Sequence, residues 1–354
     1  MGNSYHTLLL QPLHGTPHHV NRLINHIIKR IRIYFMLLSL YILREPFPQD
    51  QRKTNTIISN SNLNYIHSPL MASPDNLNFE SQVPNNLLIP RIMQLHGSIS
   101  KLESLQPSKQ VNCLFTHLVN LCTPQSSIDI MDLPQEIQVM RESLIDLCGR
   151  AEGLLELDFS TCLTKIPQPL KNLHLFPYFG NYVKLANLEN KILNENGVLQ
   201  PKRVAFVGSG PMPLTSIIMA THHMKSTHFD NFDIDVTAND VARQIVASDV
   251  ELEKRMKFVT CDIMQVREKL GDYDCLFLAA LVGMSKGEKV KILGHLWKYM
   301  KQGGILLVRS AKGARAFLYP VVDERDLVGF EILSIFHPTN DVINSVVLVR
   351  KPTF

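Results

Sequence analysis

The stretch from Val204 to Leu214 constrains the fold of this chain more than any other, and it reads VAFVGSGPMPL. Four apolar residues with the character of a buried strand run directly into a Gly-x-Gly turn, and an apolar segment suited to a helix follows at residues 215–220. This order predicts the strand, turn and helix that open a nucleotide-binding β-α unit. Taken alone, the turn is as typical of a structural turn as of a ligand site, because Pro213 stands where a dinucleotide fingerprint has its third small residue.

Strands and helices continue to alternate after this turn. Strand-like apolar runs follow at residues 231–235, 258–262, 273–281, 303–309, 330–336 and 345–350. The last two runs are joined by a turn region, which predicts an antiparallel pair. An edge of this kind is expected of the Rossmann-like α/β sheet of S-adenosylmethionine-dependent transferases rather than of a plain dinucleotide fold.

A mainly helical region precedes the expected sheet. Apolar residues recur at three- and four-residue spacing from about residue 83 to residue 193, in segments that end near prolines or polar residues. They predict an all-α N-terminal domain. We place this helical domain at residues 71–197 and the Rossmann-like S-adenosylmethionine-binding domain at residues 198–354. In this division the helical domain would carry the catalytic base and the side of the site that binds the accepting molecule.

Residues 1–70 differ in composition from the rest of the chain. A basic patch precedes an apolar run at residues 33–43, and an Asn/Ser-rich tract follows. Three interpretations stay open: a targeting segment, a disordered extension, or a gene-model artefact with Met71 as the functional start. The last two are favoured because no clean cleavage site follows the apolar run. The histidines here lack regular ligand spacing, so we predict no metal site in the tail; they are His6, His14, His18, His19 and His26.

The composition argues against several classes of protein. The formal net charge is only +4 over 354 residues, with much of the basic excess before residue 55, so no nucleic-acid partner is expected. No run of 18 apolar residues is present, which argues against stable membrane insertion. The six cysteines form no C-x-x-C pair and indicate reduced core thiols. We therefore expect a cytoplasmic protein with a small-molecule substrate, while vesicle association and a homo-oligomeric state stay open.

The third helix expected in the helical region carries a second informative pattern. Asp132 is expected to cap it with Pro134 just inside, and an apolar stripe runs along it. Gly149 and Gly153 stand one turn apart beside this stripe, and each costs roughly 1 kcal/mol against alanine. The pair indicates close approach of either another backbone or a ligand. Glu152 lies between them and is either an ordinary paired glutamate or a base whose pKa is raised by partial burial.

Side chains at the carboxyl ends of the expected strands should converge, because ligands of an open α/β sheet bind there. Asp235 would accept hydrogen bonds from ribose hydroxyls, with Asp233 as second candidate, and Asp262 would receive an adenine amino group. An acid after the second strand argues against NADP, and the acid after the third strand favours S-adenosylmethionine over NAD. The alternative is that these aspartates are ordinary turn carboxylates. The glycine turn would face the amino-acid part of the ligand with Gly208, Ser209 and Gly210.

Four runs together closely resemble plant nicotianamine synthases: GSGPMPLT (208–215), NFDID (231–235), FLAALVGM (277–284) and, split by a short gap, RS and RAFLYP (309–320). The likeness extends from about residue 84 to the C-terminus. It implies condensation of three S-adenosylmethionine molecules by 3-amino-3-carboxypropyl transfer, which yields nicotianamine and three methylthioadenosines without a metal cofactor. The family supports chelation and transport of iron, zinc and copper and the biosynthesis of phytosiderophores. An S-adenosylmethionine-dependent methyltransferase and an inactive binding homologue are the alternatives.

The resemblance also assigns roles to single residues. Glu152 matches the catalytic glutamate of the family, and Tyr182 matches the tyrosine that orients the accepting amine. Tyr178 lies near Tyr182 in the sequence and is a weaker candidate for the same role. Arg309 and Arg315 are candidates for holding substrate carboxylates, although ordinary ion pairs explain them equally well.

One departure from the family lies at Arg150, where plant relatives often carry an acid. A guanidinium that faced the cleft would lower the pKa of Glu152 and weaken proton abstraction. We expect Arg150 to face solvent, because it lies roughly 160° round the helix from Glu152.

Overall fold

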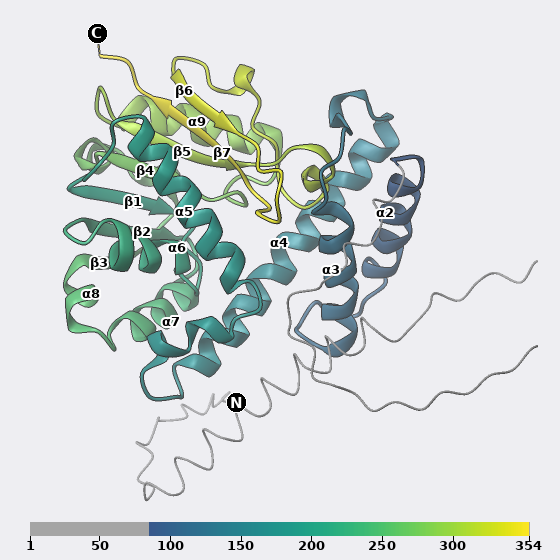
Figure 1. Cartoon of the computed structure of the whole chain (residues 1–354), viewed down its shortest axis with the longest axis horizontal. Helices are drawn as coiled ribbons and strands as arrows, with labels where there is room; N and C mark the ends of the chain where they lie inside the picture. Colours follow the sequence, from purple (N-terminus) through teal and green to yellow (C-terminus); the bar gives the residue numbers. More distant parts are fainter. Residues whose placement is uncertain (1–84, 354) are drawn as a thin grey trace, which may run out of the picture.

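The computed structural model describes residues 85–353 (Figure 1). The expectations for residues 1–70, including their histidines, and for a start at Met71 lie outside the described residues. The first part of the described chain is helical and contains α2 (Asn85–Ile99), α3 (Lys109–Cys122), α4 (Gln135–Leu163) and α5 (Phe179–Glu195).

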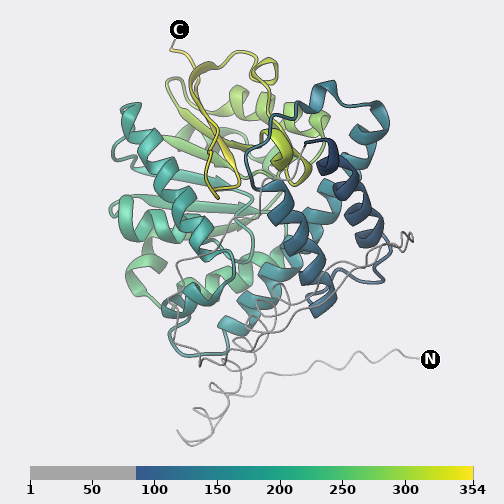
Figure 2. The ribbon, with the colours of Figure 1, turned by 45° about the vertical axis from the view of Figure 1, so that its right-hand side comes forward.

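The long helix α4 connects the two parts of the molecule. Its first half packs with α2 and α3 in one apolar core, and its second half packs with α5 in the core of the sheet. Figure 2, turned from the view of Figure 1, again shows α2 and α3 beside the sheet. The predicted helical region is therefore present, while a domain boundary at residue 197 stays a prediction.

The start of α4 differs from our expectation. The helix begins at Gln135 with Pro134 as its N-cap residue, and Asp132 belongs to a separate 3₁₀ turn. The prediction of Asp132 as the N-cap is wrong, because Leu133 precedes a proline and is held extended, with φ −76° and ψ 145°. A helix therefore cannot run through Leu133.

The second part is a seven-stranded sheet in the order β3-β2-β1-β4-β5-β7-β6. Strands β1 to β5 pair in parallel, and β7 runs antiparallel to both β5 and β6. The predicted Rossmann-like sheet with an antiparallel C-terminal edge is confirmed. The strands are β1 (Arg203–Val207), β2 (His228–Asp233), β3 (Met256–Thr260), β4 (Cys275–Leu278), β5 (Ile305–Ser310), β6 (Glu331–Phe336) and β7 (Ser345–Arg350).

Helices cover both faces of the sheet. One face packs against α5, α6 (Leu214–Ile218) and α7 (Val236–Val246), and the other packs against α9 (Lys286–Tyr299). The short α8 (Val250–Arg255) leads into β3. The remaining helical turns are η1 (Ile130–Asp132), η2 (Pro169–Leu175), η3 (Met219–His223), η4 (Ile263–Gln265), η5 (Glu268–Asp272), η6 (Gly313–Phe317) and η7 (Glu324–Asp326).

The central strand β1 explains why the opening stretch of the sequence is continuously apolar. Val204 and Phe206 belong to the core on one face, while Ala205 and Val207 belong to the core on the other. Side chains alternate between the faces of a sheet, so a strand covered on both sides must be apolar at every position.

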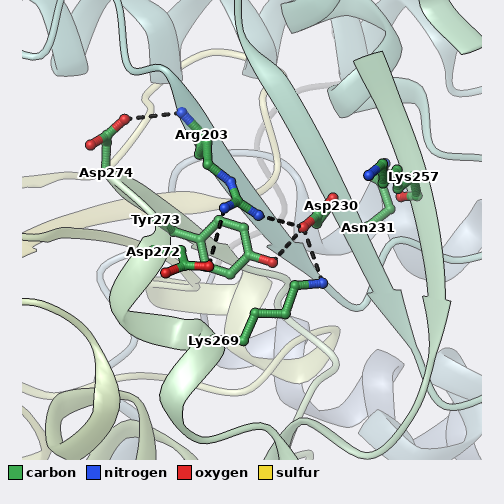
Figure 3. A network of polar contacts seen from close by, with 8 residues as sticks. All are labelled: Arg203, Asp230, Asn231, Lys257, Lys269, Asp272, Tyr273 and Asp274. Atoms are coloured by element: carbon green, nitrogen blue, oxygen red, sulfur yellow. Dashed lines mark hydrogen bonds and ion pairs between the residues drawn. The ribbon is translucent and has the colours of Figure 1, made fainter. Parts of the chain in front are cut away.

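A polar network ties the sheet together near the amino ends of β1 and β2 (Figure 3). The buried carboxylate of Asp230 accepts a hydrogen bond of 2.6 Å from the Tyr273 hydroxyl and one of 3.3 Å from the Arg203 guanidinium. The Lys269 ammonium lies 3.2 Å from the same oxygen. These contacts lie at the opposite end of the strands from the candidate site.

Two further observations bear on the sequence predictions. All six cysteines are free thiols, and three of them are buried. Among residues 85–353, no helix has the length and apolar character needed to cross a membrane.

Candidate active site

A cavity of about 1080 Å³ lies at the carboxyl ends of the parallel strands, where α3, α4 and α5 meet the sheet. Its lining unites the segments after β1, β2, β3 and β4 with side chains of these helices. The structure brings nearly all the predicted site residues to this one cavity: Glu152, Tyr178, Tyr182, Gly208, Ser209, Gly210, Asp233, Asp235, Asp262 and Arg309.

The glycine turn after β1 has a conformation that requires its glycines. Gly208 and Gly210 have φ values of 80° and 65°, in the left-handed region. A Cβ atom on Gly208 would lie 2.2 Å from Cγ2 of Val282, so even a methyl group would clash. The turn therefore brings bare backbone to the cavity wall.

Polar groups beside this turn are arranged to receive a ligand. The Ser209 hydroxyl is buried and has no hydrogen-bond partner among the described residues. Asp233, at the end of β2, accepts hydrogen bonds from the backbone N–H groups of Gly210 at 2.8 Å and of Asp235 at 3.0 Å. Asp233 thus braces the turn, and the unpaired Ser209 hydroxyl is free to bind a polar ligand atom.

Two more aspartates follow the ends of β2 and β3. Asp235 is exposed and caps α7, where its Oδ1 accepts from the N–H of Thr237 at 2.7 Å. Asp262 caps η4 in the same way and accepts from the N–H of Met264 at 2.9 Å. Both line the cavity, so their capping does not remove them from a ligand. Because the two oxygens of Asp233 already accept hydrogen bonds, one from Gly210 and one from Asp235, Asp235 stays the first candidate for the ribose.

Glu152 projects from α4 into the cavity, and Oε2 accepts a hydrogen bond of 2.8 Å from the Tyr319 hydroxyl. Burial raises the pKa of Glu152 above its ordinary value, although the hydrogen bond from Tyr319 and the charge of Arg309 oppose the rise. A carboxylate with a raised pKa is better suited to accept a proton near neutral pH. The sequence did not single out Tyr319 as a partner of Glu152.

A second glutamate, Glu156, lies one turn further along α4 and was missed by sequence reasoning. It is 8% exposed, and its Oε1 accepts a hydrogen bond of 2.7 Å from the Tyr182 hydroxyl. Burial and the neighbouring charge of Glu152 raise the pKa of Glu156 to about 8. The i, i+4 spacing of Glu152 and Glu156 was the signal that could have found it, because such residues share one helix face.

The two tyrosines of the sequence prediction differ in their surroundings. Tyr182 contacts the glutamate pair, and burial and the charges of Glu156 and Glu152 raise its pKa well above the ordinary value. Tyr178 is hydrogen-bonded to Thr116, and burial raises its pKa to about 12. Both phenols are therefore neutral hydrogen-bonding groups rather than bases.

Comparison with known proteins identifies the family to which this chain belongs. A family model described as "Nicotianamine synthase protein" matches residues 80–354. The chain belongs to the nicotianamine synthase family. It is 55% identical over 269 residues to a nicotianamine synthase of Solanum lycopersicum, and the aligned residues cover 76% of this chain and 85% of that protein. It is 51% identical over 271 residues to nicotianamine synthase 1 of Arabidopsis thaliana, with 75% and 85% covered.

Solved structures agree with this assignment at the level of the fold. A crystal structure of a mutant of MtNAS in complex with S-adenosylmethionine has a TM-score of 0.62 at 19% identity and covers 75% of this chain and 98% of that one. A structure of MtNAS in complex with MTA and tNA has a TM-score of 0.63 at 21% identity, with 75% and 97% covered. The nicotianamine synthase resemblance read from four short motifs is confirmed.

Arg309 reaches the cavity, but most of its guanidinium is already engaged. Its Nε and Nη2 atoms donate to the carboxylate of Glu189 at 2.6 and 3.0 Å, and Nη2 also donates to the Thr215 hydroxyl at 2.6 Å. Arg309 and Glu189 are both buried. The ion-pair alternative is thus what the geometry supports for Arg309.

Arg315 lies apart from the cavity residues. Its guanidinium donates to the backbone carbonyls of Thr123, Pro338 and Asn340, and it joins the segment after α3 to the turn before β7. We therefore withdraw Arg315 as a candidate for holding a substrate carboxylate. Backbone carbonyls from two distant segments take up its donors.

The surroundings of the two helix glycines differ. A Cβ atom on Gly149 would lie 3.0 Å from the sulfur of Met284, so this glycine admits a neighbouring loop. A Cβ atom on Gly153 would meet nothing within 4 Å, and Gly153 lines the cavity. The Arg150 side chain is 62% exposed and lies 3.5 Å from Asp146, so the prediction that it faces solvent is confirmed.

Proposed function

We propose that this chain makes nicotianamine from three molecules of S-adenosylmethionine, by two transfers of the 3-amino-3-carboxypropyl group and one ring closure, with release of three methylthioadenosines. In the ring closure an α-amine attacks the methylene carbon next to its own sulfonium. The observation that carries the proposal is the position of Glu152. Its partly buried carboxylate lines the same cavity as the glycine turn that would hold the donor. Family membership supports the same reaction.

In each transfer, the α-amine of the acceptor attacks the methylene carbon that joins the donor's aminocarboxypropyl arm to the sulfonium. A C–N bond forms while the C–S bond breaks, and the electron pair of the broken bond goes to sulfur, which leaves as neutral methylthioadenosine. An α-amine has an ordinary pKa of about 8 and must first lose a proton. Glu152 accepts this proton and passes it to solvent, and the cavity holds both reactants in line.

The other cavity residues divide the binding of the two reactants. The backbone of Gly208 and Gly210 and the unpaired hydroxyl of Ser209 hold the amino-acid part of the donor. Asp235 accepts from the ribose hydroxyls, with Asp233 bracing the turn, and Asp262 accepts from the adenine amino group. We assign the orientation of the accepting amine to Tyr182, with Tyr178 as a second tyrosine of the cavity lining and Arg309 as a buried cation.

The direct test is to incubate the purified protein with S-adenosylmethionine and to measure nicotianamine and methylthioadenosine by mass spectrometry. We expect Glu152→Gln to lower turnover by about 10²- to 10⁴-fold while sparing the affinity for S-adenosylmethionine. Asp235→Ala should mainly weaken binding. Well-folded protein that yields no methylthioadenosine would refute the proposal, and equal losses of binding in both variants would contradict the assigned roles.

Two alternatives give different products in the same assay. A methyltransferase would release adenosylhomocysteine in place of methylthioadenosine. An inactive homologue would bind S-adenosylmethionine without turnover, and its binding would be unchanged by Glu152→Gln. A chelator in the assay tests the further proposal that no metal is required, and turnover should then be unaffected.

The proposal includes a setting for the reaction. The product would serve chelation and transport of iron, zinc and copper and phytosiderophore biosynthesis. We place the protein in the cytoplasm with a small-molecule substrate and no nucleic-acid partner. Association with vesicles and assembly into a homo-oligomer remain open predictions, which fractionation of cells and light scattering can test.

A further inference from the structure

Glu156 is a buried carboxyl that the proposed transfer step does not use. Its Oε1 accepts the hydrogen bond from Tyr182 at 2.7 Å, and its Oε2 lies 3.0 Å from the position that a Cβ atom on Gly210 would occupy. Glu156 therefore lies beside the glycine turn that binds the donor. It also lines the cavity, so a bound molecule can contact it.

The titratable groups that face Glu156 include more carboxyls than cations. Glu152 lies on the same helix, Asp233 stands at the end of β2, and the phenol of Tyr182 comes from α5. The cation that faces Glu156 is Arg309 from β5, whose guanidinium already makes two hydrogen bonds with Glu189. Glu156 therefore faces two other carboxyls and one guanidinium that is largely committed elsewhere.

Buried carboxyls without matching cations bind protons. Burial, followed by repulsion from Glu152, raises the pKa of Glu156 to about 8, while the hydrogen bond from Tyr182 and the charge of Arg309 act in the opposite direction. In the substrate-free protein at pH 7, Glu156 is thus mostly a neutral acid. The donor that we assign to this cavity carries a sulfonium and an ammonium, and both charges favour an ionised carboxyl nearby.

We propose that Glu156 holds a proton in the substrate-free protein and releases it to solvent when the cationic donor binds beside the glycine turn. The inference rests on the proposed function, because it takes the donor to be S-adenosylmethionine. The carboxylate that forms then faces the sulfonium. Since loss of the aminocarboxypropyl group leaves a neutral sulfur, Glu156 takes a proton back and the attraction for the product is lost. Glu156 would thereby distinguish the donor from methylthioadenosine.

Thermodynamic linkage makes this proposal measurable. A group that loses a proton on binding makes the affinity fall as the pH falls below its pKa, by up to about tenfold per pH unit. At pH 6 the α-ammonium of the ligand keeps its own proton, because its pKa is about 8. Protons released at this pH therefore come from the protein.

The experiment is calorimetric titration with S-adenosylmethionine at pH 6 in two buffers that differ in ionisation enthalpy. The titrations use the Glu152→Gln background, in which burial still acts on Glu156 and turnover does not obscure binding. We expect up to one proton to be released per ligand bound, and no release when Glu156→Gln is added. Asp235→Asn in the same background is the matched control, since it removes an exposed carboxylate and should weaken binding without changing the number of protons. Methylthioadenosine should release none.

A second measurement includes an arm that needs no variant. In the unsubstituted protein, KM for S-adenosylmethionine should rise about tenfold from pH 7 to pH 6. In the Glu156→Gln protein, KM should not change over this range. Equal proton release with and without Glu156, or a flat KM profile in the unmodified protein, would overturn the proposal. Proton release by a protein that makes no nicotianamine would leave this inference standing and refute only the proposed function.

Discussion

The hydroxyl of Tyr319 donates a hydrogen bond of 2.8 Å to Oε2 of Glu152, although the two residues lie 167 positions apart in the chain. Glu152 belongs to the helix α4, and Tyr319 follows η6 after the strand β5. The carboxylate proposed as base is therefore held by a side chain from the segment between β5 and β6. Its protonation depends on how the two parts of the molecule pack together.

Tyr319→Phe should shift the pH dependence of the reaction. The hydrogen bond from Tyr319 stabilises the ionised form of Glu152 and lowers its pKa, so its loss raises that pKa further. A base with a higher pKa is protonated over a wider range, and kcat/KM should therefore rise with pH at a higher pH than before. The loss of rate should be larger at pH 6 than at pH 8. Tyr299→Phe on α9 is the control, and a uniform loss across this range would argue against the assigned contact.

Glu189→Gln should destabilise the protein strongly. Removing one partner of a buried ion pair leaves the other charge uncompensated, here the guanidinium of Arg309, at a cost of about 3 kcal/mol. Urea denaturation measures the change. Glu195→Gln on the same helix removes one partner of an exposed pair with Lys191 and should cost less than about 0.5 kcal/mol. If Glu189→Gln changed the affinity for S-adenosylmethionine and left stability intact, Arg309 would serve the substrate instead.

Lys289→Met should weaken binding of the donor, although Lys289 does not line the cavity. The buried ammonium of Lys289 donates to the backbone carbonyls of Ala279, Ala280 and Val282, in the loop whose Val282 packs on the Gly208 turn. Without these donors the carbonyl oxygens lose their hydrogen-bond partners. Each buried oxygen left unpaired destabilises this arrangement of the loop by about 1–3 kcal/mol. We expect the dissociation constant for S-adenosylmethionine to rise about tenfold. Lys291→Met, at an exposed position of the same helix, should leave it unchanged.

The sequence predicted the features of this molecule that depend on local patterns. Continuous apolar runs located β1, β4, β5 and β7 because these strands are covered on both faces. Parallel strands then brought Asp233, Asp235 and Asp262 to one rim, as expected for residues that follow neighbouring strands. The solvent-facing position of Arg150 followed from the geometry of the helix alone.

The features that the sequence did not predict depend on contacts between distant segments. The partner of Glu152 comes from Tyr319, and the backbone carbonyls that engage Arg315 come from two segments remote from it. Helix periodicity does not contain such information. Glu156 was within reach of the pattern, but its importance rests on burial and on the contact with Tyr182, which only the packing of α4 against α5 reveals.

The contact between Asp230 and Tyr273 predicts how the fold responds to acid (Figure 3). Burial would raise the pKa of Asp230, but the hydrogen bond from Tyr273 and the charges of Lys269 and Arg203 outweigh it, and the pKa lies below its ordinary value. A carboxylate with a lowered pKa stabilises the folded state above the unfolded pKa of about 4, and this contribution is lost as the pH falls through the folded pKa.

Asp230→Asn should therefore lower the free energy of unfolding by about 2 kcal/mol at pH 7, because charge-assisted hydrogen bonds are lost. It should also reduce the steepness with which stability falls below about pH 4, since the variant has no carboxylate to protonate there. Urea denaturation at pH 7 and at pH 3 measures both effects. Asp272→Asn is the matched control, because Asp272 also pairs with Arg203 but is half exposed, and its effect should stay within about 1 kcal/mol. If both variants lost the same stability at pH 7, the buried contact with Tyr273 would carry no special weight in the fold.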